Sequence, residues 1–244
     1  MSKKINRIAL ANQKGGVGKS TIATMLASYM YFVHDHSVVL IDGDSPQHTT
    51  KKLRDRELAR FKEDEDLMRA FAKSGRDQIY PITAAKMGHV FERPAPDQLS
   101  VFEKASHPKI AADTVIIDTP GSVAIEGLGT ILKSVDRVII PLEPEEMSMV
   151  SAAEFLTALR SISSIQQGAV KPVAFWNKVL LRSHQDFMTA QGEVLRAAGV
   201  HVLNNYIPYS VKVKRTEVRS TIFPVNFRSI DLSNFMEELY QTVK

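Results

Sequence analysis

The amino-acid sequence predicts an α/β fold, a doubly wound and mainly parallel sheet flanked by helices on both faces. Short apolar runs rich in β-branched residues recur along the chain without polar alternation, as expected for strands covered on both faces. Stretches with helical periodicity lie between several of these runs, which is typical of parallel strands joined by crossover helices. The carboxyl ends of the strands would then share one edge of the sheet, where ligands bind in open α/β folds.

The elements follow from these patterns in chain order, within a single domain over residues 1–244. The expected strands are Ile5–Ala11, Ser37–Ile41, Thr114–Ile117, Arg137–Leu142, Pro172–Trp176 and Val200–Ile207. The expected helices are Lys19–Val33, Ile125–Ser134, Ser148–Ile165, Gln185–Ala198 and Leu232–Val243.

Residues 51–110 interrupt this rhythm. The run Lys51–Asp66 is a dense mixture of both charges, and Ile79–His107 is polar and contains Pro81 and Pro94. We expect a solvated helix followed by a surface connection, because charge runs are usually solvated faces. The alternative is a helical or loop insertion that binds a partner.

Composition excludes several kinds of chemistry. The chain of 244 residues has no Cys, so disulfides, thiolate metal sites and cysteine nucleophiles are ruled out. Its 31 Lys and Arg against 27 Asp and Glu give a net charge of +4, which is compatible with a polyanionic partner without proving one. We expect a cytoplasmic protein, because no apolar run of about 18 residues and no signal-peptide pattern occurs.

A glycine-rich motif lies between the first expected strand and the first expected helix. It consists of Lys14, Gly15, Gly16, Val17, Gly18, Lys19, Ser20 and Thr21. Glycines allow a tight turn in which main-chain N–H groups and the helix N-terminus point at phosphate oxygens. Lys19 would reach the β- and γ-phosphates, and the Ser20 hydroxyl would ligate Mg²⁺. The motif predicts a P-loop NTPase, although Gln13 stands where a standard Walker A loop has Gly and Lys14 is an additional lysine.

Carboxylates follow two of the expected strands. Asp42 and Asp44 end the second strand, and Asp118 ends the third. At the carboxyl edge of the sheet they would face the phosphate loop, where a divalent cation and an attacking water must be held. Asp118 is the expected Walker B carboxylate, although a strand-ending Asp is often only a cap or turn residue.

Three segments together resemble the ParA/MinD superfamily of P-loop ATPases. They are KGGVGKST at residues 14–21, DGDSPQ at 42–47 and IIDTPG at 116–121. The likeness covers almost the whole chain, because residues 135–145 and 207–211 are similar to further segments of the family.

The resemblance implies ATP and Mg²⁺ as cofactors and roles for particular residues. Lys14 would cross a nucleotide-sandwich homodimer and contact the partner's phosphates, while Asp44 would orient the attacking water. Asp42 would lie beside the metal, together with Ser20 and Asp118. Residues 119–121 would form a switch that senses the γ-phosphate, and Asn177 and Pro208 would cradle adenine.

The branch of the family is narrowed by composition and by the C-terminal helix. The absence of Cys removes the iron–sulfur branches. A basic amphipathic helix would indicate membrane positioning, but here Glu237 and Glu238 lie on the polar face of Asp231–Lys244, so we expect that helix to pack on the core and expect no membrane partner.

What remains resembles the short ParA type, which lacks an N-terminal helix-turn-helix extension. This resemblance implies ATP-dependent, non-specific binding of double-stranded DNA, nucleoid association, and slow hydrolysis stimulated by a ParB-like or other partner. The candidate DNA-binding residues are Lys212, Lys214, Arg215 and Arg219. Tyr209 stands where the family commonly has an arginine, and the alternative for this stretch is a merely solvated basic loop. The rival functions are a MinD-like, conjugation-related or secretion-related positioning ATPase and a P-loop enzyme that activates small carboxylates.

Overall fold

A seven-stranded parallel sheet forms the centre of the computed structural model, in the order β3-β2-β4-β1-β5-β6-β7. The structure describes residues 4–73, 76, 78–92, 98–105, 112–121, 127–161, 170–210 and 219–244. The strands are β1 (Asn6–Leu10), β2 (Val38–Asp42), β3 (Ile82–Ala84), β4 (Thr114–Asp118), β5 (Arg137–Leu142), β6 (Lys171–Trp176) and β7 (His201–Val202). The predicted doubly wound α/β class is confirmed.

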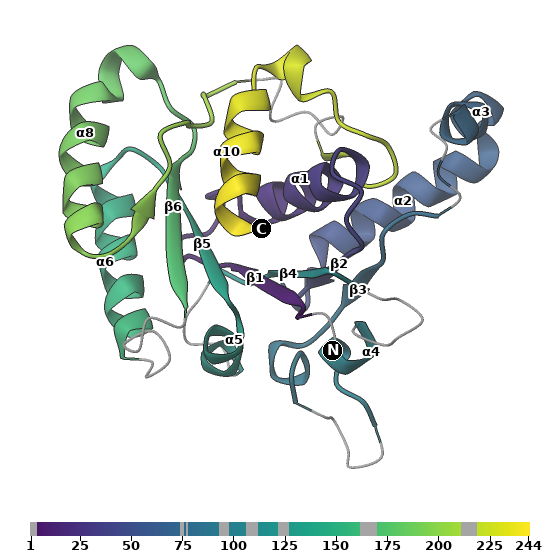
Figure 1. The fold of residues 1–244 in the computed structure, drawn as a ribbon, viewed down its shortest axis with the longest axis horizontal. Coiled ribbons are helices and arrows are strands. Elements are labelled where there is room, and N and C mark those ends of the chain that lie inside the picture. Colours follow the sequence, from purple (N-terminus) through teal and green to yellow (C-terminus); the bar gives the residue numbers. More distant parts are fainter. Residues whose placement is uncertain are drawn as a thin grey trace.

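Helices cover both faces of this sheet (Figure 1). The α-helices are α1 (Lys19–Phe32), α2 (Thr49–Glu63), α3 (Glu65–Lys73), α4 (Val101–Ala105), α5 (Leu128–Ser134), α6 (Glu146–Arg160), α8 (Leu181–Ala197) and α10 (Ser233–Val243). Two short 3₁₀ turns, η1 (Met87–His89) and η3 (Phe227–Ile230), complete the described elements. Buried residues of α1 and α10 share one apolar cluster, and those of α5, α6 and α8 share the other.

Successive residues of the central strands serve these two clusters in turn. In β1, Ile8 and Leu10 pack with α1 and α10, whereas Ala9 between them packs on the opposite face. All three side chains are fully buried. Because both faces need apolar side chains, the strands are continuous apolar runs rather than alternating ones.

The expectation of a plain surface connection is wrong for the stretch around residues 80–90. This stretch adds β3 to the edge of the sheet, where Ile41 is paired with Thr83 of β3. Tyr80 and Val90 are buried in the two cores. The polar and proline-rich composition concealed these few apolar positions, which a short edge strand needs on only one side.

The last expected strand, Val200–Ile207, is also shorter than predicted. Regular pairing ends at Val202, although the N–H of Ile207 still donates to the Trp176 carbonyl at 2.9 Å. Between them the N–H groups of Asn204 and Asn205 donate to the Glu238 carboxylate, at 2.8 and 2.7 Å. Helix α10 thus takes the hydrogen bonds that a continuing strand would have used.

Helix boundaries differ from the sequence-based ones in smaller ways. Helix α8 begins at Leu181, four residues before the expected Gln185, and α6 begins at Glu146 rather than Ser148. The expected start of one helix, at residues 125–126, and the expected end of another, at residues 162–165, lie outside the described residues.

The C-terminal helix packs on the core, as predicted. Its apolar face, formed by Phe235, Met236, Leu239 and Val243, is buried, as is Leu232 directly before the helix. Tyr29 of α1 donates a hydrogen bond to Glu237 at 2.7 Å, which ties the polar face of α10 to α1. Among the described residues, no helix has the length and apolar character needed to cross a membrane.

Candidate functional site

The glycine-rich motif forms the loop between β1 and α1, at the carboxyl edge of the sheet. Asn12, buried before the loop, donates its amide to the Pro141 carbonyl at 2.7 Å and accepts the N–H of Lys14 at 3.0 Å. One side chain therefore ties the start of the loop to the end of β5, which fixes the direction in which the loop leaves the sheet.

Glycines are required in this loop for conformational reasons. Gly16 and Gly18 have φ values of +71° and +100°, which side-chain-bearing residues rarely adopt. A Cβ on Gly18 would also lie 2.6 Å from the Asn177 amide nitrogen. The turn that precedes α1 thus needs glycine at residue 18 on two independent grounds.

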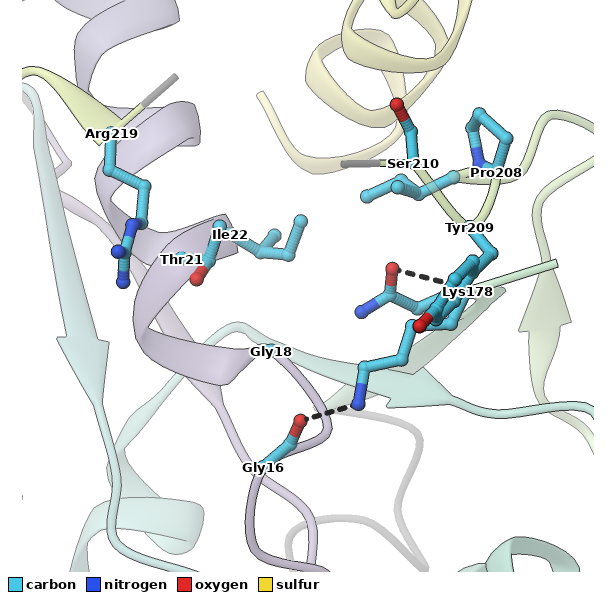
Figure 2. Close-up of a pocket in the computed structure, with 11 residues that line it drawn as sticks. Gly16, Gly18, Thr21, Ile22, Lys178, Pro208, Tyr209, Ser210 and Arg219 are labelled. Carbon is cyan, nitrogen blue, oxygen red and sulfur yellow. Dashed lines mark hydrogen bonds between the residues drawn. The ribbon is translucent and has the colours of Figure 1, made fainter. Parts of the chain in front are cut away.

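Side chains that follow β6 hold the outer side of the loop (Figure 2). The Asn177 amide donates to the Val17 carbonyl at 2.8 Å, and the Lys178 ammonium donates to the Gly16 carbonyl at 2.9 Å. Asn177 was expected to cradle adenine, but its amide group instead forms a hydrogen bond with the loop itself. Lys178 was not predicted as a site residue.

Lys19 lies buried beneath the loop and is only 7% exposed. Its ammonium donates to the Lys14 carbonyl at 3.3 Å. Burial lowers the pKa of Lys19, while the nearby carboxylates of Asp118 and Asp44 oppose this change. The three groups expected to serve phosphate, metal and water are thus gathered at one place.

Asp42 and Asp118 are paired in register at the ends of β2 and β4, and both are fully buried. Asp42 accepts main-chain hydrogen bonds from Asp44 at 3.2 Å and from Lys51 at 2.8 Å. Its carboxylate therefore shapes the turn after β2 and caps the first turn of α2. Both residues were expected beside the metal, but their surroundings differ.

Neither carboxylate oxygen of Asp118 has a hydrogen-bond partner among the described residues. Burial raises the pKa of Asp118 to about 7, and the charges of Asp42 and Asp44 add to this, whereas Ser20 and Lys19 oppose it. A buried carboxylate without a partner is costly unless a ligand satisfies it. The oxygen donors of Asp118 and Ser20 fit Mg²⁺, which keeps several waters and needs few protein ligands.

Lys14 is held by carboxylates of its own chain. Its ammonium pairs with Glu143 at 2.5 Å and also with Glu145, both just after β5. Burial alone would lower the pKa of Lys14, but these two carboxylates raise it. Glu143 also pairs with Lys178. Sequence reasoning missed Glu143, Glu145 and Lys178, although a charged E-P-E segment directly after an apolar strand was an available signal.

Beside the loop lies a cavity of about 220 Å³. Gly16, Gly18 and Thr21 form one side, and Asn177 and Pro208 form another, so the expected phosphate and adenine positions line a single space. Arg219 also lines this cavity, and its Nε is buried without a hydrogen-bond partner among the described residues. The other candidate DNA-binding residues, Lys212, Lys214 and Arg215, lie outside the described residues.

The segment after β4 packs directly against the loop. The Thr119 hydroxyl donates to the Leu10 carbonyl at 2.7 Å, and a Cβ on Gly121 would lie 3.3 Å from the Gly15 Cα. The expected switch segment is therefore in contact with the loop whose ligand it would sense.

Comparisons with known proteins agree with this geometry. A family model described as "AAA domain" matches residues 5–171, which is more than half of the chain. The chain belongs to this family. The chromosome-partitioning ATPase Soj of Thermus thermophilus is 29% identical over 163 residues, covering 65% of this chain and 63% of that protein. The chain thus spans less than two thirds of the length of this curated relative.

Two solved structures of similar fold contain nucleotides. A putative plasmid partition protein from Borrelia burgdorferi bound to AMPPNP has a TM-score of 0.63 and 20% identity, covering 98% of this chain and 99% of that one. A cobyrinic acid a,c-diamide synthase from Mycobacterium smegmatis with ADP and magnesium has a TM-score of 0.57 and 23% identity, covering 95% and 96% of the two chains.

These findings confirm the resemblance to the ParA/MinD superfamily and to its ParA-type members. The AMPPNP, ADP and magnesium are ligands of those two solved structures, and ATP and Mg²⁺ stay the expected cofactors of this chain. At these identities the two solved structures speak for the fold alone. They leave the choice between a partition ATPase and an enzyme of small-molecule metabolism to the site.

Proposed function

We propose that this protein is a ParA-like ATPase that segregates DNA. ATP would drive homodimerisation and non-specific binding of double-stranded DNA, and slow hydrolysis stimulated by a ParB-like or other partner would release the DNA. The protein would then act in the cytoplasm on the nucleoid. The observation that carries the proposal is the additional lysine, Lys14, in a phosphate loop whose Lys19 lies close to both Asp44 and Asp118.

In this proposal the loop amides and Lys19 bind the β- and γ-phosphates. Ser20 and Asp118 would hold Mg²⁺, which neutralises charge that develops on the phosphoryl oxygens during transfer. Asp44, which does not share the main-chain capping that occupies Asp42, would orient the attacking water. Asn177 would hold the loop in place through its hydrogen bond to the Val17 carbonyl, and Pro208 would line the adenine side of the cavity.

Lys14 would contact the phosphates of the nucleotide that is bound by the partner subunit. A cation that meets accumulated phosphate charge only when two subunits come together stabilises both the dimer and the transition state. The ion pairs of Lys14 with Glu143 and Glu145 would then have to break on dimerisation. Dimer formation would thus cost an intramolecular contact that only triphosphate charge can replace.

DNA would bind to the basic segment that contains Lys212, Lys214 and Arg215, with Arg219 at its end. Lysine and arginine neutralise phosphates and release counterions, which gives salt-dependent affinity without sequence preference. Arg219 lines the cavity beside the loop, so in this proposal it would link nucleotide occupancy to the segment that precedes it.

The deciding experiment measures affinity for duplex DNA of mixed sequence with ATP–Mg²⁺, with ADP–Mg²⁺ and without nucleotide. We expect tight DNA binding only in the presence of ATP–Mg²⁺, and we expect the DNA affinity to fall as the salt concentration rises. Reversing the charges of Lys212, Lys214 and Arg215 together should weaken this binding and flatten its salt dependence. Equal DNA affinity in all three nucleotide states, or no affinity in any, would contradict the proposal.

A further inference from the structure

Lys178, which follows Asn177 just after β6, carries a positive charge to the phosphate loop. Its φ of +59° lies in the left-handed region that side-chain-bearing residues seldom occupy. Such backbone conformations persist only where the surrounding structure enforces them, and they are frequent at functional sites. In Figure 2 its side chain extends along the cavity to the loop.

The Lys178 ammonium has two fixed partners. It donates to the Gly16 carbonyl at 2.9 Å and forms an ion pair with Glu143. The Glu143 side chain is only 13% exposed and is itself anchored, because its main-chain N–H donates to the Ser148 hydroxyl at 3.0 Å. Lys178 is thus fixed from the β5 side while it holds the loop.

This contact has a geometric consequence for the loop. In a trans peptide the carbonyl and the following N–H point in opposite directions. Among the described residues the only cis peptide is Ser45–Pro46, so the peptide that joins Gly16 to Val17 is trans. With the Gly16 carbonyl turned toward Lys178, the Val17 N–H points away from it.

Asn177 does the same to the next peptide. Its amide holds the Val17 carbonyl at 2.8 Å, so the Gly18 N–H also points away from β6. Two successive N–H groups are thereby turned to the other side of the loop by two neighbouring side chains. Consecutive main-chain N–H groups on one side of a turn form an anion-binding nest.

We propose that Lys178 is a positioning residue for nucleotide binding: by holding the Gly16 carbonyl, it keeps the Val17 N–H aimed at the phosphates. Its charge does not itself contact the nucleotide phosphates in this arrangement. The inference concerns the binding of any nucleotide phosphate to the monomer and does not depend on dimerisation or DNA.

The test compares Lys178→Met with wild type in the full chain. Methionine keeps an unbranched stem but removes the donor, so ADP–Mg²⁺ affinity should fall about ten-fold, the effect of losing a charge-assisted hydrogen bond. Lys178→Arg, which can donate to both Gly16 and Glu143, should recover most of the affinity. Lys171→Met removes the same charge from the exposed start of β6 and should bind ADP like wild type.

A second readout separates positioning from a general loss of stability. The unfolding temperature of Lys178→Met without nucleotide should stay close to that of wild type, while the rise caused by saturating ADP should shrink. Unchanged ADP affinity in Lys178→Met would overturn the inference. So would an affinity loss that Lys178→Arg does not recover or that merely parallels a lower unfolding temperature without nucleotide. None of these outcomes bears on DNA binding, which is tested separately.

Discussion

Gly18 is constrained by both its backbone conformation and its neighbour. Its φ of +100° belongs to glycine, and the Asn177 amide occupies the space that any Cβ would need. The same amide holds the Val17 carbonyl at 2.8 Å. Residue 18 therefore links the shape of the loop to the end of β6, and a change there acts on the fold and on ligand binding together.

Gly18→Ala should destabilise the protein by about 2 kcal/mol, because a strained φ and a displaced Asn177 add together. Its ADP affinity should fall at least about ten-fold. Gly129→Ala is the matched control: Gly129 lies in α5, and a Cβ there would meet nothing within 4 Å, so the change should stabilise by about 0.5 kcal/mol. Chemical unfolding and ADP titration measure both effects. Equal behaviour of the two variants would refute this view of residue 18.

Among the helices and strands, the charge run beginning at Lys51 shows why local composition misleads. Arg54 of α2 is 6% exposed, and its guanidinium donates to the Thr221 hydroxyl, the Thr221 carbonyl and the Tyr80 carbonyl. One arginine thus joins α2 to the chain before β3 and to a distant C-terminal segment. The run forms most of α2 and the first residues of α3 and has a solvated face, as expected, but it also carries a buried polar junction.

Helix α10 is fixed to the sheet side through Glu238. Burial alone would raise the pKa of Glu238, but hydrogen bonds from the main chains and side chains of Asn204 and Asn205 outweigh it and hold its pKa below the ordinary 4.5. The charged form of Glu238 is therefore the form that stabilises the folded state.

The stabilisation from Glu238 should be fully present above pH 4.5, the ordinary carboxyl value, and should be lost as the pH falls through the lower folded-state pKa. Unfolding free energies of wild type and Glu238→Gln, measured from pH 7 downward, should therefore converge at acid pH. Glu193→Gln is the control, because Glu193 lies on the exposed side of α8 and pairs only with Arg196 among the ion pairs of the described residues. The difference in unfolding free energy between this variant and wild type should be small at every pH. A gap between wild type and Glu238→Gln that widens toward acid pH would contradict this account.

For the molecule as a whole, the Lys14 contacts show that this lysine is already paired with carboxylates of its own subunit before any dimer forms. Lys14, Glu143, Glu145 and Lys178 form a charge network that is complete within one subunit. The proposed dimer exchanges two of these ion pairs for contacts with the partner's nucleotide. In that exchange Glu143 would keep its ion pair with Lys178, so its largely buried carboxylate would not be left unpaired.

Asp44→Ala should therefore accumulate as a dimer with ATP–Mg²⁺, because bound ATP persists when the attacking water is not oriented. Light scattering should give about twice the subunit mass of 27.2 kDa. Adding Lys14→Ala should return the protein to the monomer, with ATP still bound. A protein that stays monomeric at saturating ATP with hydrolysis blocked would refute ATP-dependent dimerisation.

Local patterns along the chain were enough to locate most elements and the phosphate loop. Apolar runs and helical periodicity placed six of the strands and most helices, and the glycine pattern placed the loop, because these signals depend on neighbours in the sequence. Residues of the same type acquire different roles only when the chain is folded. Asp42 became a cap and Asp118 stayed without a partner among the described residues, while Lys178, Glu143 and Arg54 gained roles from residues far away in the sequence. Such roles depend on which strand ends lie side by side, and that arrangement exists only in the folded chain.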